Sequence, residues 1–318
     1  MYQKGLTNMD KCDILLSVYD PNLDYLIKQL ISLNEQTYSN IELFVFDDCV
    51  TKRTERSLFL KYITKYPVTF LPYENKNLGY TKAFEKLTMA STGKYVAFCD
   101  QDDIWHPDKI EKSIQTLESD HSLIAVSDRR LIDGNDDVFV ESVKKSSHKF
   151  YDCWETGDDI LMSNIITTHA VGMSMVLNGD FLRSVVPFSK YTGHDKWVLC
   201  CAAIEGTISY INEPLVDYRR HGKNVSGVMK DINNKNDYYV KRVENQKNIF
   251  KDLELKYKDF KHKFEIEEMF DARMKHNIIK MKKFYNIAPD VFKFEMLLSI
   301  IPNSIFKLLK KLAIKFSN

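Results

Sequence analysis

Three aspartates lie within four positions of the segment FCDQDDIW, residues 98–105. They are Asp100, Asp102 and Asp103, and they directly follow an apolar run. Because like charges repel, a purely structural loop gains little from this arrangement. Carboxylates, water and phosphate oxygens are also the ligands that the hard cations Mg²⁺ and Mn²⁺ favour. The segment is therefore either a solvated acidic loop or a site for a divalent cation.

Asp100 and Asp102 form a D-x-D pair at the end of a predicted buried strand. This spacing places the two carboxylates side by side, with room for a cation and a diphosphate. A cation there would neutralise a leaving diphosphate by acting as a Lewis acid. A short acidic motif is a weak signal on its own. The choice between a solvated loop and a cation site therefore depends on the predicted elements around it.

The first 120 residues alternate between strand and helix patterns. Short apolar runs that favour buried strands occupy residues 12–18, 41–48, 68–73 and 94–100. Apolar residues at helical spacing occupy residues 20–36, 78–91 and 106–119. Asp20 is the expected N-cap of the first helix, and Pro21 is its expected first residue.

This alternation predicts an α/β fold, with a mostly parallel sheet and helices on both faces. In such sheets, ligands bind beyond the carboxyl ends of the strands. Three predicted strands end there in polar or acidic clusters, namely Tyr19 with Asp20, Asp47 with Asp48, and Asp100 to Asp103. Three clusters at one edge predict a site for a polar ligand together with a metal ion.

The later part of the chain has weaker patterns. Residues 165–178 form a β-rich run interrupted by Gly172, and residues 193–206 predict a short helix with a charged N-terminus. Residues 207–222 predict a strand with a turn at Pro214. From about residue 230 the sequence is highly charged with interspersed apolar residues, which predicts helices outside the core. We therefore expect an α/β domain at 1–228 and a helical region at 229–318.

The predicted helical region ends in a basic amphipathic helix at residues 304–316. Apolar side chains fall on one helical face and lysines on another. Such a helix either lies on an anionic membrane surface or packs on its own domain with lysines outward. The pattern alone does not distinguish these two arrangements.

Composition excludes several classes of protein. Hydrophobic residues make up 44% of the 318 and charged residues 28%, which is typical of a globular protein. The net charge of +1 gives no field that would recruit nucleic acid. The six cysteines have no CxxC pair and no zinc spacing, which suits a reducing compartment. Without a signal-peptide pattern or a long apolar stretch, we expect a cytoplasmic protein, at the inner face of the membrane if its last helix binds lipid.

Four segments in this order resemble a family 2 glycosyltransferase of the GT-A fold. They are ILLSVYDPNLDYLIKQLISLNEQTYSNIELFVFDD, NKNLGYTKAFEKLTMASTGKYVAFCDQDDIWHPDKIEK, GHDKW and EPLVDYRRHGKNVSG. The resemblance covers about residues 12–228 and points to the rhamnosyltransferase-like branch. That branch serves O-antigen, capsule and other bacterial surface polysaccharides. No single motif decides the resemblance, but the set is specific.

The resemblance implies roles at the first two strand ends. Tyr19 and Asp20 match positions that contact the base of the nucleotide donor. Asp48, with Asp47 beside it, matches the acidic pair that holds the base or ribose. This sequence departs from the family pattern at both places, with VYDP in place of a TYN-like end and DDCVTKRTE in place of DDGSxD. The departures lie in the segments that contact the base in the family.

Further roles follow from the same resemblance. Asn77 and Lys82 flank a segment that lies near the nucleotide. Asp102 matches the main ligand of a Mg²⁺ or Mn²⁺ ion, and Asp100 leans toward ribose and metal. His221 in YRRHG matches a position that reaches the metal or diphosphate, although a lone histidine there is also explained as a surface residue.

Asp195 in GHDKW matches the family's general base. The acceptor hydroxyl must lose a proton as it attacks the anomeric carbon, and a nearby carboxylate can accept that proton. A base on one face and a leaving group on the other invert the anomeric configuration. A helix-start acid stabilised by the helix dipole is the alternative explanation.

Other charged residues near these motifs have less specific roles. Asp103 is expected to support the acidic loop, and His194 to pack beside Asp195. Arg219 and Arg220 are explained equally well as diphosphate ligands or as a solvated pair.

The sequence therefore predicts an inverting transferase that uses a nucleotide-sugar donor. The donor is dTDP-rhamnose or a UDP-hexose, and the acceptor is a saccharide, expected to be lipid-linked. One alternative is a sugar nucleotidyltransferase, but SVYDPNLD lacks the glycine-rich phosphate loop expected there. The other is a non-catalytic binding subunit, which the presence of Asp102 and Asp195 disfavours.

Overall fold

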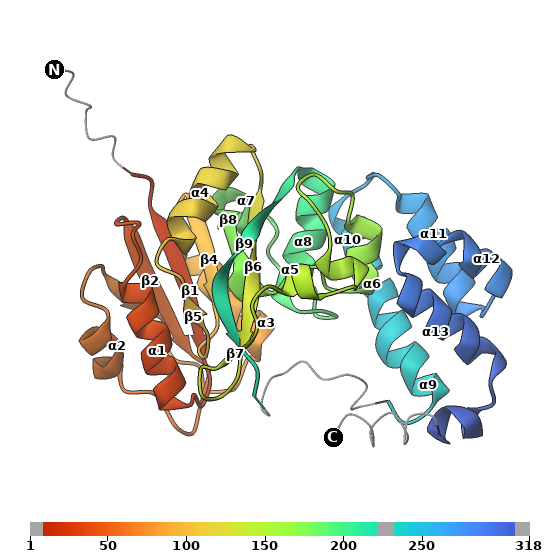
Figure 1. Ribbon diagram of the computed structural model, residues 1–318, viewed down its shortest axis with the longest axis horizontal. Coiled ribbons are helices and arrows are strands. Elements are labelled where there is room, and N and C mark those ends of the chain that lie inside the picture. Colours follow the sequence, from red (N-terminus) through yellow and green to blue (C-terminus); the bar gives the residue numbers. More distant parts are fainter. Residues whose placement is uncertain (1–8, 222–231, 309–318) are drawn as a thin grey trace. The chain divides into compact units, whose positions relative to one another are not determined.

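The computed structural model describes residues 9–221 and 232–308 (Figure 1). The chain divides into two compact units. The first contains Met1–Asp158 and Ala170–Gly222, and the second contains Asp159–His169 and Lys223–Asn318. The segment Asp159–His169 thus belongs to the same unit as the later helices. The division into domains at 1–228 and 229–318 stays a prediction.

The first unit is built around one mixed sheet, which has nine strands in the part of the chain described. Four of these strands are parallel to one another, in the order β3-β2-β1-β4. These strands are Cys12–Val18 (β1), Ile41–Asp47 (β2), Val68–Phe70 (β3) and Tyr95–Cys99 (β4). They coincide with the four predicted apolar runs, because strands covered on both faces need apolar residues throughout. The predicted α/β fold is confirmed.

The remaining strands of the sheet form both parallel and antiparallel pairs. Its strands are Ile104–Trp105 (β5), Ile124–Ile132 (β6), Val138–Val140 (β7), Met175–Asn178 (β8) and Ile208–Arg219 (β9). β8 runs antiparallel to β4 and β6, whereas β9 is parallel to β6. β5 pairs antiparallel with β9, and Ile104 lies opposite Asp217. This pairing brings the end of the acidic loop beside the end of β9.

Helices cover both faces of the sheet (Figure 1). On the face that carries Ile14 lie α1 (Leu23–Asn34), α2 (Arg56–Tyr62) and α4 (Lys109–Ser119). The other helices of this unit are α3 (Tyr80–Ala90), α5 (Val143–Ser146), α7 (Gly179–Ser184) and α8 (His194–Glu205). Phe84 of α3 packs on Phe98 of β4, with ring centroids 5.3 Å apart. The apolar layers fix the strand ends that carry the polar clusters.

The predicted start of the first helix is wrong. α1 begins after Asn22, whose side-chain oxygen accepts a hydrogen bond from the Asp24 N–H at 3.0 Å. Asn22 is therefore the N-cap instead of Asp20, and Pro21 precedes the helix. Asp20 has a φ of 39°, a left-handed conformation that aspartate tolerates better than most residues.

Two predictions in the later part of the sheet are also wrong. Part of the run 165–178 is helical, because α6 (Leu161–Ile166) extends into it and only Met175–Asn178 forms a strand. No turn occurs at Pro214, because β9 continues through it. Pro214 pairs with Asp128 where the β6–β9 register is irregular, and a proline without an N–H is tolerated at such a point.

The second unit is helical, as predicted. It contains α6, α9 (Lys235–Tyr238), a π-helical turn at Tyr239–Glu244, α10 (Asn245–Lys256), α11 (Lys263–Met274), α12 (Ile278–Lys283) and α13 (Pro289–Ile300). A fully buried ion pair joins Arg273 of α11 to Glu295 of α13, with N–O distances of 2.7 and 2.8 Å. The Tyr238 hydroxyl donates to the same carboxylate at 2.7 Å. These bonds satisfy a buried charge that would otherwise destabilise the unit.

The predicted amphipathic helix at 304–316 is described only as far as Leu308, and its remainder lies outside the described residues. Within the described part, Phe306 is buried whereas Ile305 and Leu308 are exposed. In residues 9–221 and 232–308, we find no helix with the length and apolar character needed to cross a membrane.

Candidate active site

The first strand end is joined to the acidic loop by Gln101. The Tyr19 N–H donates to the Gln101 side-chain oxygen at 2.8 Å, and the Gln101 amide donates to the Tyr19 carbonyl at 3.1 Å. The Tyr19 ring itself is 55% exposed beside this contact. Sequence reasoning missed Gln101, whose only signal is its place inside the motif. The side chain sets the separation between the ends of β1 and β4.

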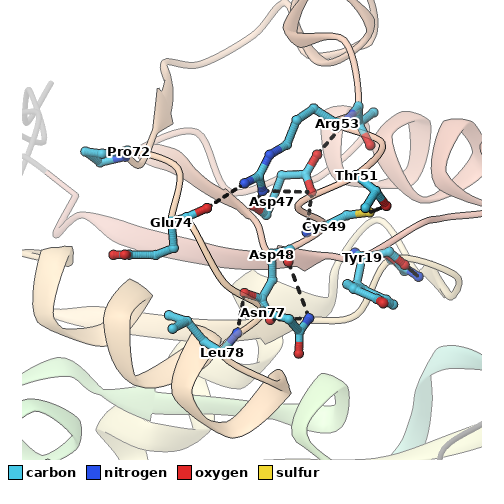
Figure 2. A network of polar contacts seen from close by, with 12 residues as sticks. Tyr19, Asp47, Asp48, Cys49, Thr51, Arg53, Pro72, Glu74, Asn77 and Leu78 are labelled. Atoms are coloured by element: carbon cyan, nitrogen blue, oxygen red, sulfur yellow. Dashed lines mark hydrogen bonds and ion pairs between the residues drawn. The ribbon is translucent and has the colours of Figure 1, made fainter.

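Asp47 organises the loop that follows β2 (Figure 2). Its carboxylate accepts hydrogen bonds from the N–H groups of Cys49 at 2.9 Å and Thr54 at 2.6 Å. Arg53 closes the loop by donating to the backbone carbonyls of Asp47 and Glu74. The loop thus keeps a defined shape without the glycine and serine of the family pattern.

Asp48 organises the approach to α3 (Figure 2). This buried carboxylate accepts bonds from the N–H groups of Leu78 and Gly79, both at 2.8 Å, and from the Asn77 amide at 3.0 Å. Gly79 has a φ of 77°, a conformation that a side chain would strain. The structure therefore brings two of the predicted nucleotide-site residues, Asp48 and Asn77, into direct contact.

Two predicted site residues are exposed, and within the part of the chain that the structure describes, each forms its ion pair with a residue outside the predicted site. Asp20 forms a loose ion pair with Lys52 at 3.5 Å. Lys82 pairs with Glu85 on its own helix at 2.7 Å. Such exposed pairs contribute little to stability, so both side chains can reorient toward a ligand.

Asp102 and His221 meet, although 119 positions separate them in the chain. The His221 Nε2 atom lies 2.8 Å from a carboxylate oxygen of Asp102. Both side chains are about one fifth exposed, at 21% and 20% respectively. The β5–β9 pairing makes this contact possible, because it aligns the two segments. The predicted pair of metal ligands is thus brought together at the surface of the site.

Asp100 is close enough to both Asp102 and Asp195 for their charges to act on it. Burial, together with the negative charges of Asp102 and then Asp195, raises the pKa of Asp100 to about 7. The Asp100 carboxyl therefore takes up a proton unless a positive charge balances it. A site with this electrostatic character favours binding of a cation.

Asp195 is in the first turn of α8 and faces Tyr80. A side chain at Gly193 would come 2.6 Å from an Asp195 oxygen and 3.4 Å from the Tyr80 hydroxyl. Partial burial raises the pKa of Tyr80, and the charges of Asp195 and Asp100 act in the same direction. Asp100, Asp195 and Tyr80 thus converge on one region. The sequence analysis missed Tyr80, whose position at the start of α3 was its only signal.

His194 packs beside Asp195, as expected. Its ring stacks on Phe84 with centroids 4.0 Å apart and meets Phe98 edge-on at 4.6 Å. Burial lowers the pKa of His194 to about 4, although the charge of Asp195 opposes this. The imidazole is therefore neutral at pH 7. It packs at the start of α8, next to Asp195.

Arg219 does not have either of the roles predicted for it. Its side chain is fully buried, so it is neither solvated nor a diphosphate ligand. The Arg219 backbone N–H donates to Asp103 at 3.0 Å, and its Nε donates to the Asp102 carbonyl at 2.8 Å. Asp103 is itself fully buried, which raises the pKa of its carboxyl well above the usual value. The expectation that Asp103 supports the loop fits this buried position.

The family model for glycosyl transferase family 2 matches residues 13–177, slightly more than half of the chain. The chain belongs to glycosyltransferase family 2. The matched residues include the ends of β1, β2 and β4 described above. The matched segment ends before Asp195 and His221, which belong to later elements of the same sheet unit.

Curated relatives agree with this family assignment. An uncharacterized glycosyltransferase of Nostoc sp. is 26% identical over 217 residues, covering 67% of this chain and 66% of that protein. A Bacillus subtilis protein named for teichuronic acid biosynthesis, the glycosyltransferase TuaG, is 33% identical over 106 residues, covering 32% of this chain and 42% of that protein. This family 2 glycosyltransferase spans two thirds or less of the length of both relatives.

Solved structures show the same fold. Staphylococcus aureus TarS 1-349 in complex with UDP superposes with a TM-score of 0.59 at 17% identity, covering 83% of this chain and 71% of that one. Its complex with UDP-GlcNAc gives a TM-score of 0.60 at 16% identity, covering 89% and 82%. At this level of identity the comparison establishes the fold of the glycosyltransferase.

Family 2 glycosyltransferases of this fold generally use a divalent metal ion. In residues 9–221 and 232–308, no three His, Cys, Asp or Glu side chains form a complete metal cluster. Mg²⁺-like ions often take only one or two carboxylates from the protein, with water and substrate phosphates as the other ligands. The Asp102–His221 pair next to Asp100 fits such a shared site. These residues would hold the ion against the donor's diphosphate.

Proposed function

We propose that this glycosyltransferase moves a sugar from a nucleoside diphosphate donor to a hydroxyl of a saccharide acceptor, with inversion at the anomeric carbon. The observation that supports this most is the convergence at Asp100. It lies in the electrostatic reach of both Asp102, which contacts His221, and Asp195 at the start of α8. In this proposal, Asp102 and His221 face the leaving diphosphate, Asp195 is the base, and the two sets of residues flank one region.

In the proposed reaction, Asp195 accepts the proton of the acceptor hydroxyl as its oxygen attacks the anomeric carbon. The bond between this carbon and the diphosphate oxygen breaks, and the diphosphate leaves with the electron pair. A divalent ion, when bound, supplies Lewis-acid stabilisation of the diphosphate charge. Asp102 and His221 would hold that ion, and Asp100 would balance its charge.

The donor's nucleoside would lie along the ends of β1 and β2. Tyr19, Asp20 and the Asp48–Asn77 pair line this path in our proposal. The complexes of TarS with UDP and UDP-GlcNAc support a nucleotide-sugar donor. We propose dTDP-rhamnose or a UDP-hexose, as the sequence resemblance suggested.

The names of the relatives support a role in bacterial surface polysaccharide synthesis. TuaG is named for teichuronic acid, a polymer of this kind. We propose a growing saccharide as acceptor, carried on a lipid. The basic segment 304–316 would then bring the enzyme to the inner face of the membrane.

The decisive experiment is donor binding with and without Mn²⁺. We expect UDP or dTDP to raise the melting temperature of the full chain, and Mn²⁺ to increase this rise. Asp102→Asn should reduce the Mn²⁺-dependent affinity at least about tenfold, because a main ligand is lost. Asp108→Asn, which removes a surface partner of Lys112, is the control.

Two results would contradict the proposal. The first is that no nucleoside diphosphate stabilises the protein in either condition. The second is that Asp102→Asn binds the nucleotide as tightly as the wild type in Mn²⁺. A screen of nucleotide sugars that measures released UDP or dTDP would then identify the donor of an active preparation.

A further inference from the structure

We propose that Arg219 is a positioning residue that holds the acidic loop in the geometry that its metal and diphosphate need. This inference rests on the proposed role of Asp102. Arg219 touches neither substrate nor reacting atoms in this proposal. It acts through the backbone of Asp102 and through the placement of His221.

Arg219 holds the acidic loop at two consecutive residues. Its guanidinium Nε donates to the Asp102 carbonyl at 2.8 Å. Its backbone N–H donates to the Asp103 carboxylate at 3.0 Å. One residue therefore fixes both the main chain and a side chain of the loop. Because the loop places three carboxyl groups within four residues, we expect this anchor to keep Asp102 in place.

The other end of the guanidinium is anchored to a second loop. Its Nη1 donates to the Asp133 carbonyl at 2.9 Å, and it forms an ion pair with Asp136. Asp136 also binds Lys28 of α1, so this loop is tied to a long helix. The guanidinium carbon lies 4.3 Å from the centre of the Tyr25 ring on the same helix. The acidic loop is thus braced against α1 through Arg219.

The same arrangement places His221. β9 ends at Arg219, but the Arg220 N–H still donates to the Ile132 carbonyl of β6 at 2.8 Å, so the pairing continues one residue farther. Alternation along such a paired segment would place the side chains of residues 219 and 221 on the same side and that of residue 220 on the other. The exposure pattern agrees, because Arg219 is buried and Arg220 is exposed. The His221 ring also lies 5.8 Å from the Tyr25 ring that packs on Arg219. Fixing Arg219 therefore fixes both members of the Asp102–His221 pair.

Only arginine can make this set of contacts. Its planar guanidinium offers five donors in a rigid fork, whereas lysine offers one flexible ammonium. A lysine at 219 would keep the charge but lose at least one of the bonds to the Asp102 and Asp133 carbonyls. This difference makes Arg219→Lys a test of geometry at constant charge.

The experiment compares Arg219→Lys with the matched control Arg183→Lys in the full-length chain, because the Arg183 guanidinium also donates to a backbone carbonyl, that of Gly93, and to a carboxylate, that of Asp180. Hydrogen exchange of residues 98–105 is measured without metal or nucleotide, and the affinity for UDP and dTDP is measured with and without Mn²⁺. We expect exchange in this segment to rise about tenfold or more in Arg219→Lys. We expect the Mn²⁺-dependent part of nucleotide affinity to fall about 10- to 100-fold, as when other residues that orient a metal ligand are lost. The metal-free affinity of Arg219→Lys, and all measurements on Arg183→Lys, should stay near the wild-type values.

A second variant keeps the proposal testable if Arg219→Lys fails to fold. Asp136→Asn removes the ion pair that anchors the guanidinium, and asparagine tolerates the φ of 73° at this position. It should produce smaller changes in the same direction. Unchanged exchange in residues 98–105 for either folded variant would overturn the proposal. If wild-type protein binds no nucleotide, the proposed function fails, but the exchange measurement still decides whether Arg219 braces the loop.

Discussion

Three neighbouring carboxylates of the acidic loop have three different environments. Asp102 is partly exposed and contacts His221, whereas Asp103 is fully buried on the Arg219 N–H. Burial and the charges of Asp102 and Asp195 together raise the pKa of Asp100. The sequence predicted that Asp102 and Asp103 would differ. It could not show the cause, because Arg219 and His221 lie more than one hundred positions away.

The first prediction concerns Asp195 as the proposed general base. Asp195→Asn keeps the size and polarity of the side chain but cannot accept the acceptor's proton. Transfer should fall by about 10²- to 10⁴-fold, the usual contribution of a general base, whereas UDP or dTDP affinity should stay within about twofold. The measurements are released nucleoside diphosphate under donor saturation and calorimetric binding.

Asp180→Asn is the matched control for this prediction. Asp180 is also an acid in the first turn of a helix, α7, but it is paired with Arg183 at the surface. If Asp195 served only the helix dipole, both variants would lose a little stability and keep activity. Near-normal turnover of Asp195→Asn would rule out its role as the base.

The sequence did not predict the roles of polar side chains that hold the backbone. Gln101 and Arg219 hold neighbouring main-chain groups, and such contacts depend on the fold more than on residue spacing. Asp48 ends a predicted strand, and the family resemblance implied a place near the nucleotide for both Asp48 and Asn77, but only the structure shows their hydrogen bond. The sequence identified polar positions near the strand ends but not the bonds that orient them.

At the level of elements, the apolar runs predicted β1 to β4 well. β5 has only two residues and no periodic pattern, so no sequence signal could have revealed it. It nevertheless positions the site, because its pairing with β9 brings His221 to Asp102. The turn expected at Pro214 was wrong for a related reason, because an irregularity in pairing absorbs the proline.

The loop between β3 and α3 allows a prediction for a single glycine. Gly79 has φ 77° and ψ 154°, a region that is nearly restricted to glycine. A Cβ there would meet no atom within 4 Å, so backbone strain is the only cost. Gly79→Ala should lower the free energy of unfolding by about 1–3 kcal/mol. It should also weaken nucleotide binding, because the Gly79 N–H orients Asp48.

Gly157→Ala is the control for strain alone. Gly157 has a φ of 82° and likewise no atom within 4 Å of an added Cβ. It should lose similar stability in urea unfolding but bind UDP or dTDP normally. Equal nucleotide affinity for the two variants would show that the loop at Gly79 does not shape the binding site.

At the scale of the whole molecule, the two units are stabilised in different ways. The sheet unit has a large apolar core, whereas the helical unit relies in part on the buried Arg273–Glu295 pair. All three tryptophans, Trp105, Trp154 and Trp197, belong to the sheet unit. Tryptophan fluorescence therefore reports the unfolding of the unit that carries the site.

The sheet unit contains a buried lysine that should make its stability depend on pH. Lys109 is fully buried over the Trp105 ring at 3.7 Å, and its ammonium nitrogen has no hydrogen-bond partner among the described residues. Burial lowers the pKa of Lys109 to about 8 from 10.5. Between these two values the unfolded chain binds a proton that the folded chain does not. Folding stability due to this group therefore rises with pH in this window and is lowest below about pH 8.

Lys109→Met should remove this dependence while filling similar space. At pH 7 we expect the variant to be more stable than the wild type by about 2–3 kcal/mol, because it avoids the cost of a buried charge. The difference should shrink steadily as the pH rises from 8 to 10. Urea unfolding followed by tryptophan fluorescence at several pH values measures it. Lys112→Met on the same helix is the control, since ion pairs raise the pKa of Lys112 and should leave its difference constant across this range. A difference for Lys109→Met that is equally constant would mean that Lys109 keeps its proton throughout, with its charge balanced inside the fold.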